Sequence, residues 1–364
     1  MGKIIVIGGG IGGLTCGALL AEAGYAVTLY EQAQVLGGCA STFRRGPFIF
    51  DVGATQVAGL EPGGIHWRVF QRLGLPVPPA TDCDPACAVF LPGESEPINL
   101  WRDPERWRAE REHHFPGSEP FWRLLQTLFD ASWRFQGRDP VVPPRSPWDL
   151  GQLLQAFAPD TWITAPFSLL TVGDALRLLG LGSQRRLKTF LDLQLKLYSQ
   201  VGADETALLY GATALSVSQA PKGLFHLQGS MQVLSDSLAA GLEKFNGRIL
   251  TRRRVEKIHS RGGRAVGLTV RDLKTGVVTQ ESADQIVANV TVQDLVKLLD
   301  TVPFAYQQRV SQLASPSGAF VLYLGVTDAA ISPDCPPHLQ FLYDPQGPVG
   351  ENNSLFVSVS KPGD

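Results

Sequence analysis

The first 31 residues decide the fold, and residues 3–31 read KIIVIGGGIGGLTCGALLAEAGYAVTLYE. The apolar run at residues 3–7 predicts a short buried strand, the small and apolar residues from Ile11 to Ala23 predict a helix, and Ala26–Tyr30 predicts a second strand. Glycines fill the turn between the first strand and the helix. The stretch therefore predicts a βαβ unit that opens with a glycine-rich turn.

The glycines of this turn match the spacing G-x-G-x-x-G, which is typical of dinucleotide-binding turns. Gly8 permits the tight turn, Gly10 lets backbone amides approach a pyrophosphate, and Gly13 lets the helix pack closely on the strand. The first N–H groups of the helix, around Ile11 and Gly12, have no partner within the helix and can bind an anion. A pyrophosphate site is therefore expected here.

An acidic residue, Glu31, follows the second strand and lies 18 residues after Gly13. A carboxylate in this position can accept hydrogen bonds from both ribose hydroxyls of an adenosine. Two further segments, Gly37-Gly38 and Arg44-Arg45, are expected to bring backbone N–H groups and positive charge to the same region. Additional donors of this kind suit the second phosphate and ribityl chain of FAD better than a plain NAD site. A glycine pair by itself also fits an ordinary loop.

The order of expected elements indicates an α/β protein with a Rossmann-like FAD-binding domain, a β-meander and an inserted α+β substrate domain. The remaining expected elements are, in chain order, a helix at 65–73 capped by Gly74, a hairpin at 86–101, aromatic helices around 121–133, a helix and β-meander at 230–280, a central parallel strand at 286–290, and strands at 319–326 and 354–360. The expected parts are FAD-binding at 1–79, substrate-binding at 80–225, FAD-binding at 226–300 and substrate-binding at 301–364.

Composition excludes several classes of function. The 32 Lys and Arg residues balance 34 Asp and Glu residues, so the chain lacks the excess of cations that nucleic acid would require. Five cysteines, an odd number, favour a reducing compartment, and the cytoplasmic side is expected. No uncharged run reads as a membrane-spanning helix, so any membrane contact is expected to be peripheral. The sequence does not indicate an oligomeric state.

Other residue patterns have simpler interpretations. Cys83 and Cys87 lack nearby histidines, so no metal site is expected, and His113-His114 are expected on a solvated helix face. The aromatic residues at 121–133 fit either a helix core or an apolar tunnel, and the cations at 185–196 fit either an ordinary amphipathic helix or contact with an anionic membrane. The sequence contains no recognisable Ser-His-Asp or Cys-His arrangement, so it does not indicate a catalytic side chain.

Several segments together resemble the carotenoid desaturase and carotenoid isomerase family of FAD-dependent flavoproteins. They are residues 4–31, Gly37-Gly38, FDVG at 50–53, GSM at 229–231 and ADQIVAN at 283–289. Two further segments, LDLQLKLYSQ at 191–200 and FVLYLGV at 320–326, are most similar to C-3',4' desaturases. The glycine and acid motifs are shared with amine oxidases.

The resemblance implies FAD as cofactor and a hydrophobic carotenoid as substrate, with hydride passing from a carbon beside the polyene to flavin N5 as a new double bond forms. It implies pyrophosphate contacts at Gly8, Gly10, Ile11, Gly12 and Gly13, a ribose contact at Glu31, adenine stacking beside Val255, and further contacts at Gly37, Gly38 and Arg45. A carotenoid cis-trans isomerase that uses reduced FAD is the alternative. An amine oxidase and a non-catalytic prenyl-lipid carrier are further alternatives.

The sequence departs from the family pattern in two places. HLQGS at 226–230 stands where the family has Pro-x-Gly-Gly, which puts a flavin contact near Met231 in doubt. The glycine-rich C-terminal FAD-binding segment of the family has no counterpart in these 364 residues, so this chain alone is expected to hold FAD poorly.

Overall fold

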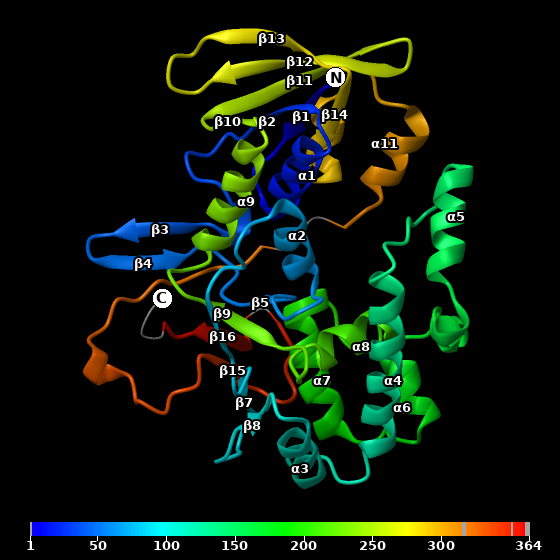
Figure 1. The fold of residues 1–364 in the computed structure, drawn as a ribbon. Helices are drawn as coiled ribbons and strands as arrows, with labels where there is room; N and C mark the ends of the chain where they lie inside the picture. The colour runs from blue at the N-terminus through cyan, green and yellow to red at the C-terminus, as the bar shows by residue number, and fades with distance from the viewer. Residues whose placement is uncertain (1, 315–317, 351, 361–364) are drawn as a thin grey trace. The chain divides into compact units, whose positions relative to one another are not determined.

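The computed structural model describes residues 2–314, 318–350 and 352–360, and it divides them into two compact units (Figure 1). The first unit comprises residues 2–81 and 226–328, and the second comprises residues 82–225 and 329–360. The expected last boundary at residue 300 lies at residue 328 instead. The reason is that helix α11 (Phe304–Ser311) packs on helix α10 (Val292–Leu298), which follows the last strand of the first unit.

A four-stranded parallel sheet forms the centre of the first unit. Its strand order is β10 (Arg248–Leu250), β2 (Ala26–Tyr30), β1 (Lys3–Ile7) and β14 (Gln285–Ala288). Helix α1 (Ile11–Glu22) connects β1 to β2, so the predicted βαβ unit is confirmed. Strand β14 is parallel to β1 as predicted, but within the described residues it lies at the edge of the sheet rather than at its centre.

The two faces of β1 pack against different layers because successive side chains of a strand point in opposite directions. On one face, α1 and α9 (Gln232–Lys244) pack closely: a Cβ built at Gly17 would lie 2.7 Å from Cδ1 of Leu242 and 3.8 Å from Cγ2 of Val6. On the other face, Ile5 and Ile7 share a buried cluster with the predicted β-meander, which is formed by β11 (Arg253–Arg261), β12 (Arg264–Asp272) and β13 (Val278–Ser282). The meander is confirmed, and four of the five β1 residues are buried.

Shorter elements complete the first unit. Helix α2 (Ile65–Leu73) ends at Gly74, which has the left-handed conformation (φ 60°) that a glycine cap favours, as predicted. The others are η1 (Gly38–Ala40), β3 (Thr42–Arg45), β4 (Phe48–Asp51) and β5 (Val57–Ala58). In the described chain, β6 (Ala80–Asp82), β9 (Leu224–Leu227) and η3 (Asp328–Ala330) lie where the chain passes between the units.

The strand expected at 319–326 is absent from the structure. Residues 318–327 take no regular secondary structure, and Phe320 is 97% exposed. The Tyr323 hydroxyl donates a hydrogen bond to the Val52 carbonyl (2.7 Å), and its ring meets Phe43 edge-on. The run has the composition of a strand, but in the described residues it has no neighbouring strand to bind its backbone, so the prediction was wrong.

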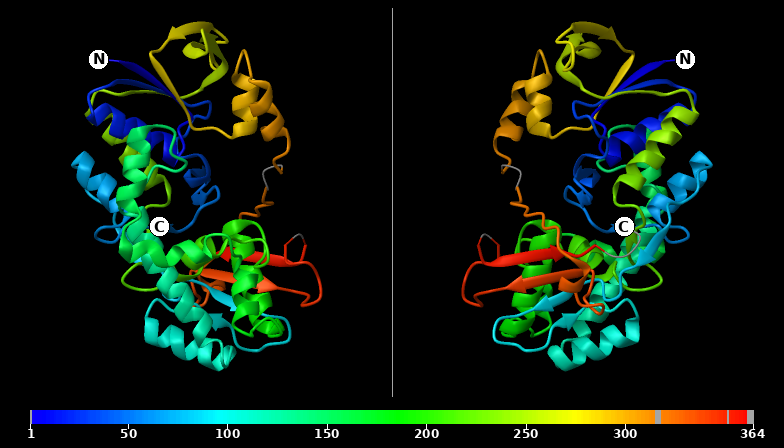
Figure 2. Two further views of the ribbon diagram at one scale, coloured as in Figure 1. Left: turned by 90° about the vertical axis from the view of Figure 1, so that its right-hand side faces the viewer. Right: turned by 90° about the vertical axis from the view of Figure 1, so that its left-hand side faces the viewer.

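The second unit combines a sheet with a group of helices. The sheet order is β16 (Ser354–Ser358), β15 (His338–Leu342), β7 (Ala88–Phe90) and β8 (Ile98–Asn99), and Figure 2 shows the orange and red strands beside the cyan strand from the early chain. The predicted hairpin between β7 and β8 is confirmed. The helices are α3 (Pro104–His114), α4 (Glu119–Gln136), α5 (Pro147–Ala156), η2 (Pro159–Phe167), α6 (Val172–Leu178), α7 (Arg185–Ser199) and α8 (Leu208–Ser216).

The aromatic residues of α4 belong to the core of this unit. Phe121, Trp122 and Phe129 are at most 3% exposed, and Trp122 packs edge-on against Trp107 of α3. These rings are therefore a helix core, the first of the two interpretations of the sequence pattern. Trp133 is only partly buried, and together with Phe129 it borders a small surface groove of about 170 Å³ between α4 and residues 219–222.

The expectation that both adjacent histidines lie on a solvated face was wrong for His114. Its side chain is only 8% exposed and lies beside Arg186 and Glu110. Burial, followed by the Arg186 charge, lowers the pKa of His114. The adjacent aromatic residue, Phe115, is fully buried and draws the helix end into the core.

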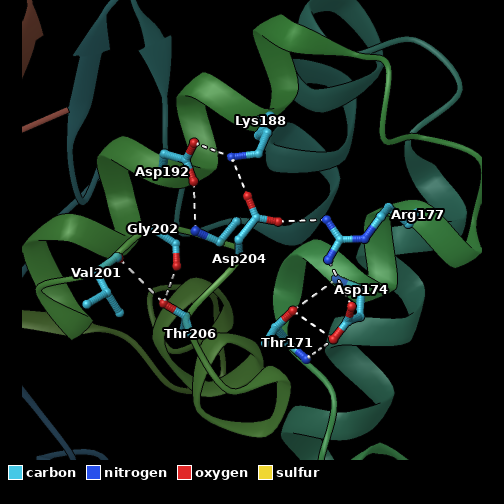
Figure 3. Close-up of polar contacts among 10 residues, drawn as sticks. Thr171, Asp174, Arg177, Lys188, Asp192, Val201, Gly202, Asp204 and Thr206 are labelled. Carbon is cyan, nitrogen blue, oxygen red and sulfur yellow. Dashed lines mark hydrogen bonds and ion pairs between the residues drawn. The ribbon is translucent and has the colours of Figure 1, made fainter. Parts of the chain in front are cut away.

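A polar network fixes the corner between α6, α7 and the loop before α8 (Figure 3). Asp204 binds Arg177 (2.8 Å) and Lys188 (3.1 Å), and Lys188 also binds Asp192 (2.8 Å). These partners lower the pKa of Asp204, chiefly through its hydrogen bond with Arg177. The charges of this surface are therefore largely satisfied by one another.

Candidate dinucleotide-binding site

The glycine turn between β1 and α1 is held in a shape that only glycine fits at two positions. Gly8 has φ 99° and donates its N–H to the Tyr30 carbonyl (2.9 Å). A Cβ built at Gly13 would lie 2.0 Å from the Gly8 carbonyl oxygen, which is inside any van der Waals contact. The close approach of helix and turn therefore depends on the absence of a side chain at Gly13.

The N-terminus of α1 is open. Gly10 precedes the helix in an extended conformation and supplies no cap, and the first turn contains no acidic residue. No side chain in the described part of the chain accepts a hydrogen bond from the N–H groups of Ile11, Gly12 or Gly13. A Cβ at Gly10 would meet only Nδ2 of Asn289, at 3.4 Å. The turn therefore presents unsatisfied donors and the positive end of a 12-residue helix.

Glu31 lies beside this turn with both carboxylate oxygens oriented. Oε2 accepts a hydrogen bond from the Gly9 N–H (2.6 Å), and Oε1 accepts one from the Ala33 N–H (2.7 Å). Its backbone is fixed as well, because its N–H donates to Leu250 (3.0 Å) and its carbonyl accepts from Arg253 (2.8 Å). Each carboxylate oxygen keeps a further lone pair, so the group can still accept two hydroxyl hydrogen bonds.

The Gly37-Gly38 pair returns to the glycine turn. Gly37 (φ 108°) donates its N–H to the Gly9 carbonyl (2.8 Å), and a Cβ at Gly38 would lie 3.5 Å from the Cα of Gly10. A Cβ at Gly37 would lie 2.4 Å from Oγ of Ser235 in α9. The pair is therefore a second segment of bare backbone beside Gly10, rather than a remote loop.

The remaining two predicted site residues lie in different surroundings. Val255 is 7% exposed in β11, next to an irregularity in the pairing of that strand with β12, and its strand begins at the hydrogen bond between Arg253 and Glu31. Arg45 is exposed and ends β3 at the turn of the β3–β4 hairpin. The structure thus brings Glu31, Gly37 and the β11 strand to the glycine turn, and shows no contact there for Arg45.

The N-terminus of α9, by contrast, is occupied by side chains of the protein. An oxygen of Asp51 accepts hydrogen bonds from the Met231 N–H (3.0 Å) and the Thr42 hydroxyl (2.9 Å), and Thr42 Oγ1 accepts one from the Gln232 N–H (3.2 Å). Ser230 has φ 80° where the family pattern has glycine. The β3–β4 hairpin therefore caps this helix.

Sequence reasoning missed the role of Asn289. It follows β14, and its backbone N–H donates to the Ile7 carbonyl (2.8 Å), so it reaches the glycine turn at the carboxyl end of the sheet. Its side-chain oxygen would lie 2.9 Å from a Cβ at Gly12, and its carbonyl oxygen 2.5 Å from a Cβ at Gly8. The signal was the end of a predicted parallel strand, because such strand ends meet at one edge of the sheet.

Within the described residues, no group of three His, Cys, Asp or Glu side chains could hold a metal ion. Cys83 and Cys87 are buried and form no disulfide, and burial raises the pKa of Cys87 to about 12. A thiol with so high a pKa is a poor nucleophile and metal ligand. Among the described residues, no helix has the combined length and apolar character needed to cross a bilayer.

Anion-binding N–H groups at α1, room beside Gly10, and a fixed carboxylate on Glu31 are the donor and acceptor set that a diphosphate and an adenosine ribose require. Among the described residues, the Asn289 side chain comes within 3.4 Å of the Cβ position of Gly10, but no hydrogen bond joins it to the first N–H groups of α1. The residues present therefore fit the group that the sequence implies.

Comparisons with known proteins agree with this fold. A family model described as an NAD(P)-binding Rossmann-like domain matches residues 6–73. Prolycopene isomerase 2, chloroplastic, of an Oncidium hybrid cultivar is 26% identical over 374 residues, which cover 98% of this chain and 60% of that protein. The phytoene desaturase (neurosporene-forming) of Rhodobacter capsulatus is 25% identical over 388 residues, covering 100% of this chain and 70% of that protein. The chain thus spans about 60% of the length of the first of these relatives.

A solved structure, the CLA-producing fatty acid isomerase of P. acnes, superposes with a TM-score of 0.56 at 17% identity, over 85% of this chain and 64% of that one. At this identity the likeness concerns the fold. It confirms the predicted architecture, in which a Rossmann-like domain with a meander is joined to an inserted α+β unit.

Proposed function

We propose that this chain, a member of the carotenoid desaturase and carotenoid isomerase family, binds FAD at the α1 N-terminus and desaturates a carotenoid. One observation carries the proposal. The open N-terminus of α1 and the fixed carboxylate of Glu31 lie together, in a chain that matches carotenoid-processing enzymes over nearly its whole length.

Different residues of the site would bind different parts of the cofactor. The amides after Gly10 would hold the diphosphate, and the Glu31 carboxylate would hold the adenosine ribose. Gly37 and Gly38 extend the bare backbone beyond the length that a single phosphate needs, which favours FAD over a mononucleotide. Asn289 lies against the other side of the glycine turn and keeps its shape.

When bound, FAD supplies a two-electron acceptor for hydrogen taken from a saturated carbon–carbon bond. The protein's contribution is to hold the cofactor at its nucleotide end and to present an apolar substrate. No described side chain is assigned as an acid or base. The carotenoid, as a hydrocarbon-rich partner, would be recognised by shape rather than by hydrogen bonds.

Isomerisation is the second candidate, because prolycopene isomerases match this chain as well as the desaturase does. The two reactions differ in mass balance: desaturation removes two hydrogens for each new double bond, whereas isomerisation leaves the formula unchanged. A flavin-free protein that binds a prenyl lipid would instead support the carrier alternative. Oxidation of amines would support the amine-oxidase alternative.

The test is to incubate the purified chain and candidate carotenoids with oxidised FAD in one arm and with dithionite-reduced FAD in a second arm, and to separate the pigments by chromatography with mass detection. The proposal expects flavin absorbance in the protein and a product lighter by two hydrogens. An isomer of unchanged mass would support the isomerase. A colourless protein that never takes up flavin would contradict both.

A further inference from the structure

The residue that follows β14 lies at the same edge of the sheet as the glycine turn. Figure 1 shows β14 beside β1, and the two strands are parallel, so Asn289 leaves its strand beside the point where Gly8 leaves β1. The N–H of Asn289 is bound to the Ile7 carbonyl, and Thr291 is already the N-cap of α10. The backbone of Asn289 is therefore fixed from both sides, and its side chain has a defined place.

The side chain of Asn289 brings uncommitted donors to the start of α1. Its Nδ2 atom would lie 3.4 Å from a Cβ built at Gly10 and 3.1 Å from one built at Gly13. The side chain is exposed, and it forms no hydrogen bond with the rest of the described chain. A primary amide carries two N–H donors. Both are therefore available beside the first turn of α1, where the open backbone N–H groups lie.

The glycine at position 12 fits the same arrangement. In the spacing G-x-G-x-x-G, Gly12 occupies a position that tolerates any residue. A Cβ there would lie 2.9 Å from Oδ1 of Asn289, closer than such atoms normally approach. Glycine therefore leaves the room in which the amide of Asn289 lies against the helix.

Three strand ends at this edge of the sheet present three different groups. Strand β1 ends at the glycine amides, β2 ends at the Glu31 carboxylate, and β14 ends at the Asn289 amide. A carboxylate accepts from hydroxyl groups and repels phosphates, whereas an amide is an uncharged donor that can bind phosphate oxygens. The chemistry of Asn289 therefore matches the anion rather than the ribose.

We propose that Asn289 binds the diphosphate of the dinucleotide, with its Nδ2 group donating a hydrogen bond to a phosphate oxygen held at the N-terminus of α1. The contact that holds the shape of the turn is made by the Asn289 carbonyl, which would lie 2.5 Å from a Cβ at Gly8, so the side chain is left for the ligand. The inference rests on the proposed function. It adds a donor from the second part of the first unit to a site otherwise formed by residues 8–38.

The test is a titration of FAD, and of ADP as a diphosphate without flavin, into the 364-residue chain and two variants. Asn289→Ala removes the donors, whereas Asn289→Asp keeps the shape of the side chain and places a negative charge beside the phosphates. The alanine variant should bind both ligands about tenfold more weakly than the wild type, and the aspartate variant at least tenfold more weakly again. Urea unfolding should show no loss of stability in either variant.

The matched control is Asn246→Asp, the same change at an exposed residue that precedes β10 at the opposite edge of the sheet. It should bind both ligands like the wild type. A side chain that only fills space would give the reverse order, with normal binding in Asn289→Asp and a loss in Asn289→Ala alone. That order, or equal binding by all the proteins, would overturn the proposal and leave the proposed function intact.

Failure of the proposed function gives a different result. A wild-type chain that binds ADP but not FAD would contradict the flavin proposal, while the order of the Asn289 variants with ADP would still decide the role of this side chain. A wild-type chain that binds neither ligand would overturn both.

Discussion

Two helices of the first unit begin at glycine-containing turns, and their N-termini are used differently. At α1 no side chain of the described residues takes the first N–H groups, whereas at α9 Asp51 and Thr42 accept from Met231 and Gln232. Both helix ends offer the same partial positive charge. Of these two N-termini, that of α1 is therefore the one available to bind a ligand anion, whereas that of α9 anchors the β3–β4 hairpin.

The largest expected effect comes from closing the turn at α1. In Gly13→Ala the new Cβ would lie 2.0 Å from the Gly8 carbonyl oxygen. The gain in helix propensity is about 1 kcal/mol, but relieving this overlap requires backbone movement that costs about 3 kcal/mol or more. We expect marked destabilisation in urea unfolding. A variant as stable as the wild type would mean that the turn is looser than described.

Gly10→Val separates binding from folding. Gly10 has φ −71°, which any residue adopts, and its Cβ position is nearly free of contacts. The variant should therefore unfold within about 1 kcal/mol of the wild type, while its side chain obstructs the approach of a diphosphate to the amides. Flavin titration should show a loss of 100-fold or more, with Gly10→Ala intermediate. Normal FAD uptake by the valine variant would place the phosphates elsewhere.

Glu31→Ala should weaken FAD binding by tenfold or more, because each charge-assisted hydrogen bond to the ribose contributes about 1.5–3 kcal/mol. The same change removes the acceptor for Gly9 N–H, so the thermal midpoint must be measured beside the titration. Glu243→Gln, an exposed carboxylate of α9, is the control and should change neither value. Equal FAD affinity in Glu31→Ala and the control would exclude the ribose role.

Asp51→Ala should show the opposite pattern from Gly10→Val. It removes the cap of α9 and the anchor of Thr42, which should lower the free energy of unfolding by about 1–2 kcal/mol. FAD affinity per folded molecule should change by less than about fivefold, which corresponds to a change in binding free energy of less than about 1 kcal/mol. Chemical denaturation and titration of the same preparation give both values. Loss of FAD binding without loss of stability would mean that FAD binds at α9 rather than at α1.

The smallest effect is expected for Ser230→Gly. Ser230 has φ 80°, a conformation that costs a non-glycine residue about 1–2 kcal/mol. Its hydroxyl lies 3.1 Å from Thr42 Oγ1 and donates to it, because the Thr42 proton goes to Asp51, and this hydrogen bond contributes about 1 kcal/mol. The two terms nearly cancel, so stability should rise slightly or stay level. Ser230→Val should be clearly less stable, and equal stability of the two variants would refute the strain.

The sequence predicted those parts of the site that depend on local pattern. The strand at 3–7, the turn after Gly8 and the acid at Glu31 follow one another within a single βαβ unit, so residue order alone indicates their arrangement. Asn289 was missed because its position depends on a parallel pairing with Ile7 across the sheet. The capping role of Asp51 likewise depends on Met231, 180 positions along the chain.

The strand expected at 319–326 failed for a related reason. Its continuous run of apolar and aromatic residues suits a strand, but strand formation requires a partner for the backbone, and composition does not report whether one is present. The engagement of His114 with Arg186 also joins distant segments, 72 residues apart. In both cases the prediction was wrong because the local pattern does not report which distant residues lie beside the segment.

The most direct test of the central claim is a calorimetric titration of FAD into three proteins: the wild type, Gly10→Val and Asp51→Asn. The account predicts weak but saturable binding at one site in the wild type, closely similar affinity in Asp51→Asn, and no measurable binding in Gly10→Val while that variant remains folded. Binding that survives Gly10→Val but is lost in Asp51→Asn would contradict the account, because it would place the anion at α9 rather than at the open N-terminus of α1.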